Sequence, residues 1–173
     1  MRFCDIPQFT SSGRYNVDMS MEFLIKQIDM WIEEEGLQLN PDFQRGHVWT
    51  GDQQVKYIEH VLRGGRSGRN LYFNCPSWLK SNYKGIYRDF VCVDGLQRIT
   101  AIRRFLNNEI AVFGQYYTEF EGVTDLVRHG MHVNVNDLQS RKDVLQWYIE
   151  MNEGGTPHTK AELARVKRMI ANA

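Results

Sequence analysis

The chain has 173 residues and a mass of 20.3 kDa, with 42% hydrophobic residues, 24% charged residues and a formal net charge of +0. A chain of this size buries about two thirds of the surface of its unfolded form, so these values exclude a disordered or collagen-like protein and predict one folded domain. No apolar run approaches the roughly 20 residues of a membrane span, and the N-terminus lacks a secretory pattern. We therefore expect a cytoplasmic protein without a membrane partner, in which Cys4, Cys75 and Cys92 are reduced thiols.

Charge is unevenly distributed along the chain. Residues 56–104 carry ten Lys or Arg and three Asp or Glu, whereas residues 1–55 carry four and nine, and residues 105–173 carry seven and nine. A cationic centre in a neutral protein favours a local anionic ligand, such as a nucleotide or a short stretch of nucleic acid backbone. Within this centre a Gly- and Ser-rich segment predicts a flexible basic loop, whose Arg63, Arg66 and Arg69 are candidate DNA contacts or simply solvated charges.

The apolar pattern predicts an irregular arm at residues 1–16 and a single α+β domain at residues 17–173. Helices are indicated where apolar residues recur at helical spacing behind a capping residue, and strands where β-branched or aromatic residues stand between turn residues. The expected elements are a helix from near Asp18 to Gly36, an extended piece at 37–39, a helix from Thr50 to Gly64, strands at 70–75 and 89–93, a helix from just after Gly95 to Asn108, a strand or hairpin at 110–120, a helix through Val144 and Met151, and a last helix opened by the capping box of Thr159 and Glu162. This order predicts a small central β-sheet flanked by about five helices.

The junction at Asp94 is the most informative place in the sequence. An apolar strand ends in Asp94-Gly95 and turns at once into a helix, whose first N–H groups have no partner within the helix and form a natural seat for phosphate. Gly95 would let a ligand approach the backbone, and Arg98 in the first turn is unfavourable to the helix dipole unless an anion lies nearby. Asp94 could bind a metal ion such as Mg²⁺, orient Arg98 or act as a base toward water, and Gln97 could position a ligand or a water molecule. The structural alternative is that Asp94 caps the helix and Arg98 is a surface charge.

A second polar cluster precedes the helix that begins near Thr50. Arg45 could grip a phosphate with two parallel hydrogen bonds, and His47 could donate to the same anion or transfer a proton near neutral pH. Phe43 and Trp49 suit a hydrophobic core or a staple across the helix start.

Other sites have weaker support in the sequence. His129 and His132 are three residues apart and could share a helical face, but no cysteine or carboxylate completes a metal set at a recognisable spacing. The sequence has no G-x-S-x-G, no G-x-x-x-x-G-K-[ST] and no H-E-x-x-H pattern.

Taken together, three blocks resemble the DGQQR family of domains of unknown function, found at the N-terminus of GmrSD-type restriction enzymes and in the phosphorothioate-sensing protein SspE. The blocks are Pro41-Asp-Phe-Gln-Arg45 ahead of a tryptophan and a helix, Val93-Asp-Gly-Leu-Gln-Arg-Ile-Thr100 after a strand, and Asn152-Glu-Gly-Gly-Thr-Pro157 before a capped helix. The resemblance spans about residues 37–170 and implies a ParB/sulfiredoxin-like fold in a bacterial or phage-encoded protein.

The resemblance also implies a function for the motif residues. Asp94, Gly95, Gln97 and Arg98 would serve the hydrolysis of a nucleoside triphosphate (NTP), with Gln44 and Arg45 lining the same pocket from the opposite side. Leu96 stands where the family motif has its first glutamine, and the nuclease extension of the restriction enzymes is absent from this sequence. Because of Leu96 the resemblance implies nucleotide binding more directly than hydrolysis, and because of the missing extension it does not imply independent DNA cleavage.

These observations leave three hypotheses open. The first is a nucleotide-binding protein that hydrolyses NTP at Asp94 with Arg45 and Arg98 on the phosphates, with or without Mg²⁺. The second is a metal-dependent DNA nuclease or nickase that uses the same pocket. The third is a non-enzymatic module in which a bound nucleotide gates an interaction with DNA or a protein partner.

Overall fold

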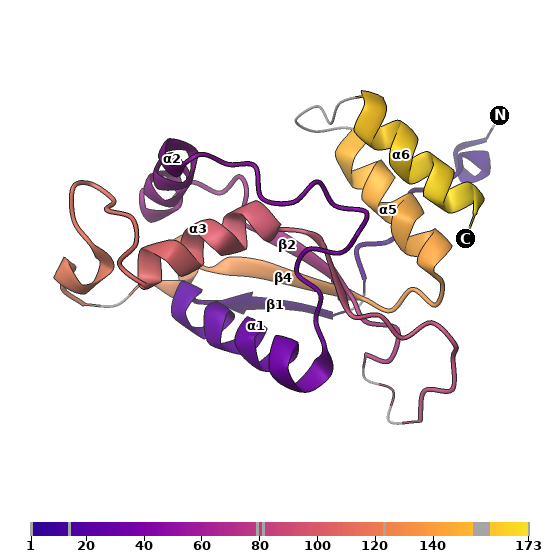
Figure 1. Cartoon of the computed structure of the whole chain (residues 1–173), viewed down its shortest axis with the longest axis horizontal. Helices are drawn as coiled ribbons and strands as arrows, with labels where there is room; N and C mark the ends of the chain where they lie inside the picture. Colours follow the sequence, from indigo (N-terminus) through magenta and orange to yellow (C-terminus); the bar gives the residue numbers. More distant parts are fainter. Residues whose placement is uncertain are drawn as a thin grey trace.

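A four-stranded mixed sheet lies at the centre of the computed structural model, which describes residues 2–13, 15–78, 80, 82–122, 124–153 and 160–172 (Figure 1). Its strands are β1 (Tyr15–Met19), β2 (Asn70–Asn74), β3 (Val91–Asp94) and β4 (Met131–Asn136), in the spatial order β1-β4-β2-β3. The pair β2 and β4 is parallel, whereas β1 with β4 and β2 with β3 are antiparallel. Gln38 forms a parallel bridge to Val91, so the extended piece predicted at 37–39 lies along the outer edge of β3. The predicted α+β class is confirmed.

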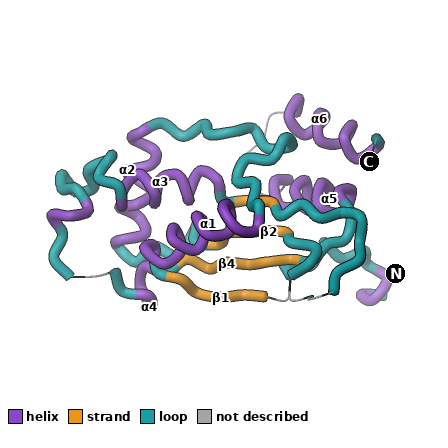
Figure 2. Tube along the Cα trace, turned by 60° about the horizontal axis from the view of Figure 1, so that its bottom comes forward, coloured by secondary structure: helices purple, strands orange, loops and turns teal. Residues whose placement is uncertain are grey.

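Two hydrophobic clusters lie on opposite faces of β3, because neighbouring residues on a strand point to opposite sides of the sheet. Cys92 belongs to the cluster that α1 (Met21–Glu35), α2 (Gly51–Leu62) and α3 (Leu96–Leu106) complete. Val91 and Val93 belong to the other, which α5 (Arg141–Glu153) and α6 (Lys160–Ala171) complete. Figures 1 and 2 show α1 and α3 along the sheet and α5 with α6 at the end where the C-terminus lies. The strand that leads into the D-G-L-Q-R block is therefore packed on both faces.

Local capping signals set the starts of the first two long helices. Ser20 accepts a hydrogen bond from the Phe23 N–H at the start of α1, and Gly36 ends the helix in the left-handed conformation with a φ of 72°. Thr50 and Gln53 form the predicted capping box at the start of α2, so that prediction is confirmed.

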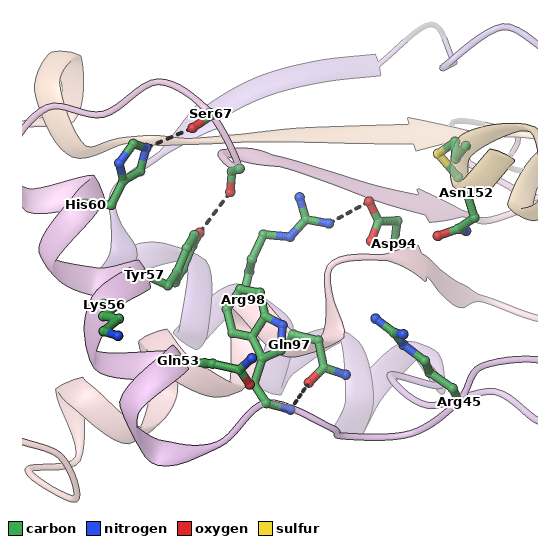
Figure 3. Close-up of a pocket in the computed structure, with 13 residues that line it drawn as sticks. Arg45, Gln53, Lys56, Tyr57, His60, Ser67, Asp94, Gln97, Arg98 and Asn152 are labelled. Atoms are coloured by element: carbon green, nitrogen blue, oxygen red, sulfur yellow. Dashed lines mark hydrogen bonds and ion pairs between the residues drawn. The ribbon is translucent and has the colours of Figure 1, made fainter. Parts of the chain in front are cut away.

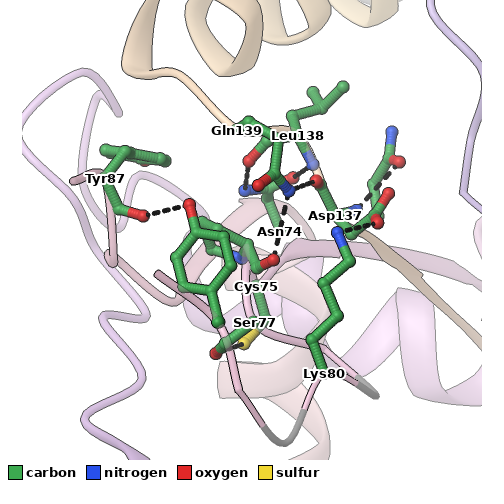
Figure 4. Close-up of polar contacts among 11 residues, drawn as sticks. Asn74, Cys75, Ser77, Lys80, Tyr87, Asp137, Leu138 and Gln139 are labelled. Atoms are coloured by element: carbon green, nitrogen blue, oxygen red, sulfur yellow. Dashed lines mark hydrogen bonds and ion pairs between the residues drawn. The ribbon is translucent and has the colours of Figure 1, made fainter. Parts of the chain in front are cut away.

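A buried amide joins β2 to the connection between β4 and α5 (Figure 4). Asn74 is 0% exposed, its Nδ2 donates to the Leu138 carbonyl at 3.2 Å, and its Oδ1 accepts from the Leu138 N–H at 2.8 Å. Lys80 and Asp137 add an ion pair of 2.6 Å at the surface of the same corner. These contacts fix the direction in which the chain leaves β4, and so place α5 against β3.

Several sequence predictions of local structure are wrong. The helix predicted from near Asp18 to Gly36 is present but begins at Met21, because Tyr15, Val17 and Met19 alternate with polar residues in the edge strand β1, which also overlaps the end of the predicted arm. The strand or hairpin expected at 110–120 is a tight turn bridged between Val112 and Gln115, followed by a short 3-10 helix, Tyr117–Glu119.

The largest omission is β4, since the sequence analysis assigned no strand at 131–136. His132 lies on this strand while His129 ends the short helix α4 (Leu126–His129), so the two histidines share no helical face. The capping box predicted at Thr159 falls in 154–159, outside the described residues. Within the described chain, six helices accompany the sheet, and none combines the length and apolar character needed to cross a membrane.

Candidate functional site

A cavity of about 690 Å³ lies where β3 ends, between α2, the first turn of α3 and the end of α5 (Figure 3). Its walls include residues from both sequence blocks singled out above, Asp94, Gln97 and Arg98 from one and Arg45 from the other. The remaining lining residues are Trp49, Gln53, Lys56, Tyr57, His60, Ser67, Gly68, Met151 and Asn152. The fold thus brings together segments that are about 50 residues apart in the sequence.

The turn between β3 and α3 depends on Gly95. This residue has a φ of 146°, and a Cβ added here would lie 2.8 Å from the Cδ2 of Leu71 in the core. The structure therefore gives a reason for the glycine that differs from the predicted one, namely backbone conformation and core packing rather than space for a ligand. No side chain caps the first turn of α3, which is the condition that the predicted phosphate seat requires.

Arg98 and Asp94 form an ion pair on one wall of the cavity. An Nη of Arg98 lies 2.5 Å from Oδ2 of Asp94, and the other Nη donates to the Asn70 carbonyl at 2.8 Å. The Arg98 side chain is 15% exposed and the Asp94 side chain 40%. Burial acts to lower the pKa of Arg98, but the charge and hydrogen bond of Asp94 outweigh it and raise that pKa above its ordinary value. Arg98 is therefore a fixed cation whose orientation is set before any ligand arrives.

Gln97 binds the loop that precedes α2. Its Oε1 accepts from the N–H groups of Val48 and Trp49, at 2.9 and 3.1 Å, and its Nε2 donates to the Gly46 carbonyl at 2.7 Å. These bonds occupy both ends of the amide. In this structure Gln97 consequently positions the loop, whereas the sequence analysis predicted a catalytic role for it.

Arg45 stands on that loop and its side chain lines the cavity. Within the described chain its guanidinium makes no hydrogen bond or ion pair to a side chain or carbonyl, so its donors are available to a ligand. Arg45 also borders a smaller cavity of about 60 Å³, which Gln44 and Asp94 line as well. Gln44 donates to the Cys92 carbonyl at 2.6 Å and thereby ties the loop to β3.

The loop is also held from α6, by a residue that the sequence analysis missed. Arg165 donates to the carbonyls of Asp42, Phe43 and Gln44, at 2.9, 2.9 and 3.1 Å. Arg141 on α5 forms an ion pair of 2.8 Å with the Asp42 carboxylate. No local sequence pattern connects Arg165 to residues more than 100 positions earlier, so only the tertiary structure reveals this brace.

The other predicted binding residues lie outside the cavity lining. His47 is exposed, and its ring nitrogen lies 3.3 Å from the Nε2 of Gln54 rather than in the cavity. Arg63 and Arg66 are exposed, and the Arg63 guanidinium lies 5.1 Å from the centre of the Phe113 ring. Arg69 is only 3% exposed and donates to the carbonyls of Gly65 and Arg128, so it braces the loop instead of presenting a charge to solvent.

The sequence analysis also missed the wall that α2 contributes. Gln53, Lys56, Tyr57 and His60 follow the spacing of one helical face, and this regularity was the available signal. The Tyr57 hydroxyl donates to the Gly68 carbonyl at 2.9 Å, and burial raises the pKa of Tyr57 well above its ordinary value. Tyr57 is therefore a neutral hydrogen-bond donor at physiological pH.

Asp94 is the one carboxylate among the described residues that line the cavity. Among the described residues, no three or more His, Cys, Asp or Glu side chains are grouped so that they could hold a metal ion. One carboxylate together with ligand phosphates is a common environment for Mg²⁺, so Asp94 fits a metal that arrives with a nucleotide better than a metal held by protein side chains alone.

Comparison with known proteins adds one match. A family model described as GmrSD restriction endonuclease, N-terminal domain, matches residues 28–130, which include Arg45 and the whole D-G-L-Q-R block. Comparisons with curated proteins and with solved structures give no match, so the ParB/sulfiredoxin-like assignment stays a prediction.

Proposed function

Since this chain belongs to the GmrSD restriction endonuclease N-terminal domain family, we propose that it binds a nucleoside triphosphate, with the phosphates held between Arg45 and Arg98. Membership places the chain among restriction-endonuclease-associated domains and supports a role related to nucleotides or DNA. The choice of a nucleotide, and of these residues, is our inference from the cavity.

The proposal rests on one observation: Arg45 and Arg98, from two separate sequence blocks, line the same cavity. Lys56 adds a third cation to the lining, against the single carboxylate of Asp94. Arginine binds phosphate through two parallel N–H donors. The uncapped start of α3 adds backbone N–H groups, which are also donors with partial positive charge. The cavity volume of about 690 Å³ lies within the usual range for small-molecule sites.

Hydrolysis would then proceed from Asp94. In the ligand-free protein an Arg98 N–H group pairs with the Asp94 carboxylate. Phosphate oxygens would compete for that N–H group, so nucleotide binding would free the carboxylate. Asp94 accepts a proton from water while the water oxygen bonds to the terminal phosphorus, and the bond from that phosphorus to the bridging oxygen breaks to release a nucleoside diphosphate. Arg45 and Arg98 hold the charge that develops on the phosphate oxygens. A Mg²⁺ bound with the nucleotide would supply further neutralisation of that charge, and Asp94 is the residue that would hold it.

The arrangement of Gln97 favours a second function, which is nucleotide binding without turnover. Its Oε1 and one of its two Nε2 N–H donors bind the loop backbone, and Leu96, which stands where the family has another glutamine, has no polar group to orient a water molecule. Because Gln97 connects the D-G-L-Q-R block to the Arg45 loop, a bound nucleotide would instead set the position of that loop. The loop would then gate contact with DNA or a partner protein, with exposed Arg63 and Arg66 as proposed DNA contacts.

The experiment combines calorimetric titration of ATP, GTP, CTP and UTP in the presence of Mg²⁺ with an assay for phosphate release. We expect the wild type to bind at least one NTP and to release phosphate. Asp94→Asn should retain binding and lower release by about 100-fold or more, and Arg98→Lys should weaken binding by about 10-fold. Asp137→Asn, which breaks an exposed ion pair away from the cavity, is the matched control and should change neither quantity.

Each outcome discriminates between the hypotheses. Binding by the wild type without phosphate release would select the gating function over hydrolysis. Failure of the wild type to bind any of the four NTPs would overturn the proposal.

A further inference from the structure

The cavity continues beyond the phosphate-binding residues to the C-terminal end of α2. Figure 3 shows Arg45, Asp94 and Asn152 at one end of the cavity and His60 with Ser67 at the other, with Arg98 between them. The far end carries hydrogen-bonding groups and an aromatic ring rather than a pair of arginines. The two ends therefore suit different parts of one ligand.

His60 and Ser67 form a hydrogen-bonded pair at this far end, with 2.9 Å between the Ser67 Oγ and the His60 Nε2. The imidazole lies against the backbone of the intervening loop, because a Cβ added to Gly65 would lie 2.3 Å from Nε2 and 2.4 Å from Cε1 of that ring. The backbone of Gly65 has no left-handed φ, so space for the ring is what the glycine provides. Both side chains of the pair are exposed, and a pair of this kind adds little to folding stability.

An aromatic wall lies beside this pair. The rings of Tyr57 and Trp49 are 5.3 Å apart at an angle of 57°, and both residues line the cavity. The Tyr57 hydroxyl is already bonded to the Gly68 carbonyl, so the ring surface is what Tyr57 offers to a ligand. Planar nucleic acid bases stack favourably on such rings.

The order of groups in a nucleotide matches the order of groups in the cavity. In a nucleoside triphosphate the ribose separates the base, on C1′, from the phosphates, on C5′, so phosphates held at Arg45 and Arg98 leave the α2 end of the cavity for the base. We propose that this end is a base-recognition subsite, in which His60 and Ser67 hydrogen-bond the edge of the base and the Tyr57 and Trp49 rings pack against it. The inference rests on the proposed nucleotide-binding function and names its substrate class, a nucleoside triphosphate chosen by its base rather than any polyphosphate.

The test compares inorganic tripolyphosphate, which can use only the phosphate end, with ATP, GTP, CTP and UTP by calorimetry. We expect wild-type protein to bind tripolyphosphate, and to bind its preferred NTP about 10-fold or more tightly than tripolyphosphate and than the least favoured NTP. His60→Ala and Ser67→Ala should weaken the preferred NTP by about 10-fold, reduce the spread among the four bases to about 3-fold, and leave tripolyphosphate affinity unchanged.

Two further variants sharpen the test. Gly65→Ala adds a methyl group where the imidazole lies, so it should reduce base preference as His60→Ala does without removing a polar group. His132→Ala removes another exposed, hydrogen-bonded histidine, on β4, and should leave all five affinities unchanged.

Two results would overturn the subsite. One is equal affinity of the wild type for tripolyphosphate and all four NTPs, and the other is an unchanged base preference in both His60→Ala and Ser67→Ala. Failure of the wild type to bind tripolyphosphate or any of the four NTPs would have a different meaning, because it would remove the proposed function together with this inference.

Discussion

The two blocks that meet in the cavity are held in place by different forces. The Asp94–Arg98 block follows a strand packed on both faces and opens a helix whose inner side is buried, so the core and the backbone hydrogen bonds fix it. The loop from Pro41 to Trp49 belongs to no helix or strand; Phe43 anchors it in the second hydrophobic cluster, and side-chain hydrogen bonds hold the rest of it. Gln44 of the loop donates to the Cys92 carbonyl, and Gln97, Arg141 and Arg165 reach the loop from other elements.

This difference indicates which half of the site can move. Displacing Arg98 requires disruption of the main core. Arg45 lies between the buried Phe43 and the partly buried Trp49, and the backbone around it is held mainly by a few partly exposed hydrogen bonds, each worth about 1 kcal/mol. A cavity with one rigid wall and one adjustable wall can close on a ligand without unfolding. Substitutions in the Asp94–Arg98 block should therefore mainly lower the free energy of unfolding, whereas substitutions that loosen the loop should mainly lower the affinity for NTP.

The largest expected effect is on stability, at Gly95. An alanine there must adopt a φ near the observed 146° and place its methyl group 2.8 Å from Leu71, so we expect a loss of about 2–4 kcal/mol in the free energy of unfolding by urea denaturation. Gly122→Ala is the control, since its φ of 88° is also positive but a Cβ would meet nothing within 4 Å. It should cost about 1 kcal/mol. Equal losses of stability in the two variants would show that core packing does not fix the Asp94–Arg98 block, which is the rigid half of the site.

The next effect concerns affinity, at Gln97. Gln97→Leu removes the three hydrogen bonds to the Gly46–Trp49 loop, so NTP affinity should fall by about 10- to 100-fold in a calorimetric titration while the free energy of unfolding changes by less than in Gly95→Ala. Gln146→Leu, at an exposed position bonded to Glu150, is the control. An affinity equal to the wild type would mean that the loop needs no amide to hold Arg45 in place.

A smaller effect is expected at Arg165. Arg165→Ala removes the donors to the carbonyls of Asp42, Phe43 and Gln44 but leaves the bonds of Gln97, so NTP affinity should fall by about 3- to 10-fold. Arg168→Ala changes an exposed arginine on the same helix and should have no effect. A loss as large in Arg168→Ala would point to the overall charge of α6 rather than to the brace.

The smallest expected change is in cysteine reactivity, which reports on the rigid half directly. Cys4 is exposed, whereas Cys75 and Cys92 are buried, and burial raises the pKa of Cys92 to about 12. Iodoacetamide at pH 8 should therefore modify Cys4 rapidly and the other two slowly, as followed by mass spectrometry of peptides. The pattern should be the same in Gln97→Leu, because Cys92 faces the core. Rapid labelling of Cys92 in that variant would contradict the separation of the two halves.

Elements whose signals are local could be predicted from the sequence. The capping box of Thr50 and Gln53 lies within four residues, and the strand before Asp94 is a continuous apolar run, so both were identified correctly. β1 alternates apolar and polar residues, but it is short and directly precedes the helix whose apolar period begins at Met21, so its residues were assigned to the arm and to the start of that helix. β4 was missed because His132, Asn134 and Asn136 have low strand propensity, and its pairing on both sides stabilises it regardless.

The candidate site was predictable where the chemistry of a residue is evident from its type and position. Arg45, Asp94 and Arg98 were named from the sequence and do line one cavity. Gln97 also lines it, but the three backbone partners that define its contacts lie about 50 residues away, and no sequence pattern reveals them. The contacts of His47 with Gln54 and of Gly95 with Leu71 were likewise not predictable, because no sequence pattern connects these residues.

The most direct test of the account is ATP binding to Arg45→Ala, measured by calorimetry with Mg²⁺ present. Arg45 makes no hydrogen bond or ion pair within the described chain, so its removal should leave the free energy of unfolding unchanged and lower the affinity by about 10-fold or more. Arg88→Ala, at an exposed arginine outside the cavity, should bind as the wild type does. An Arg45→Ala protein with wild-type affinity would contradict the claim that the phosphates lie between Arg45 and Arg98.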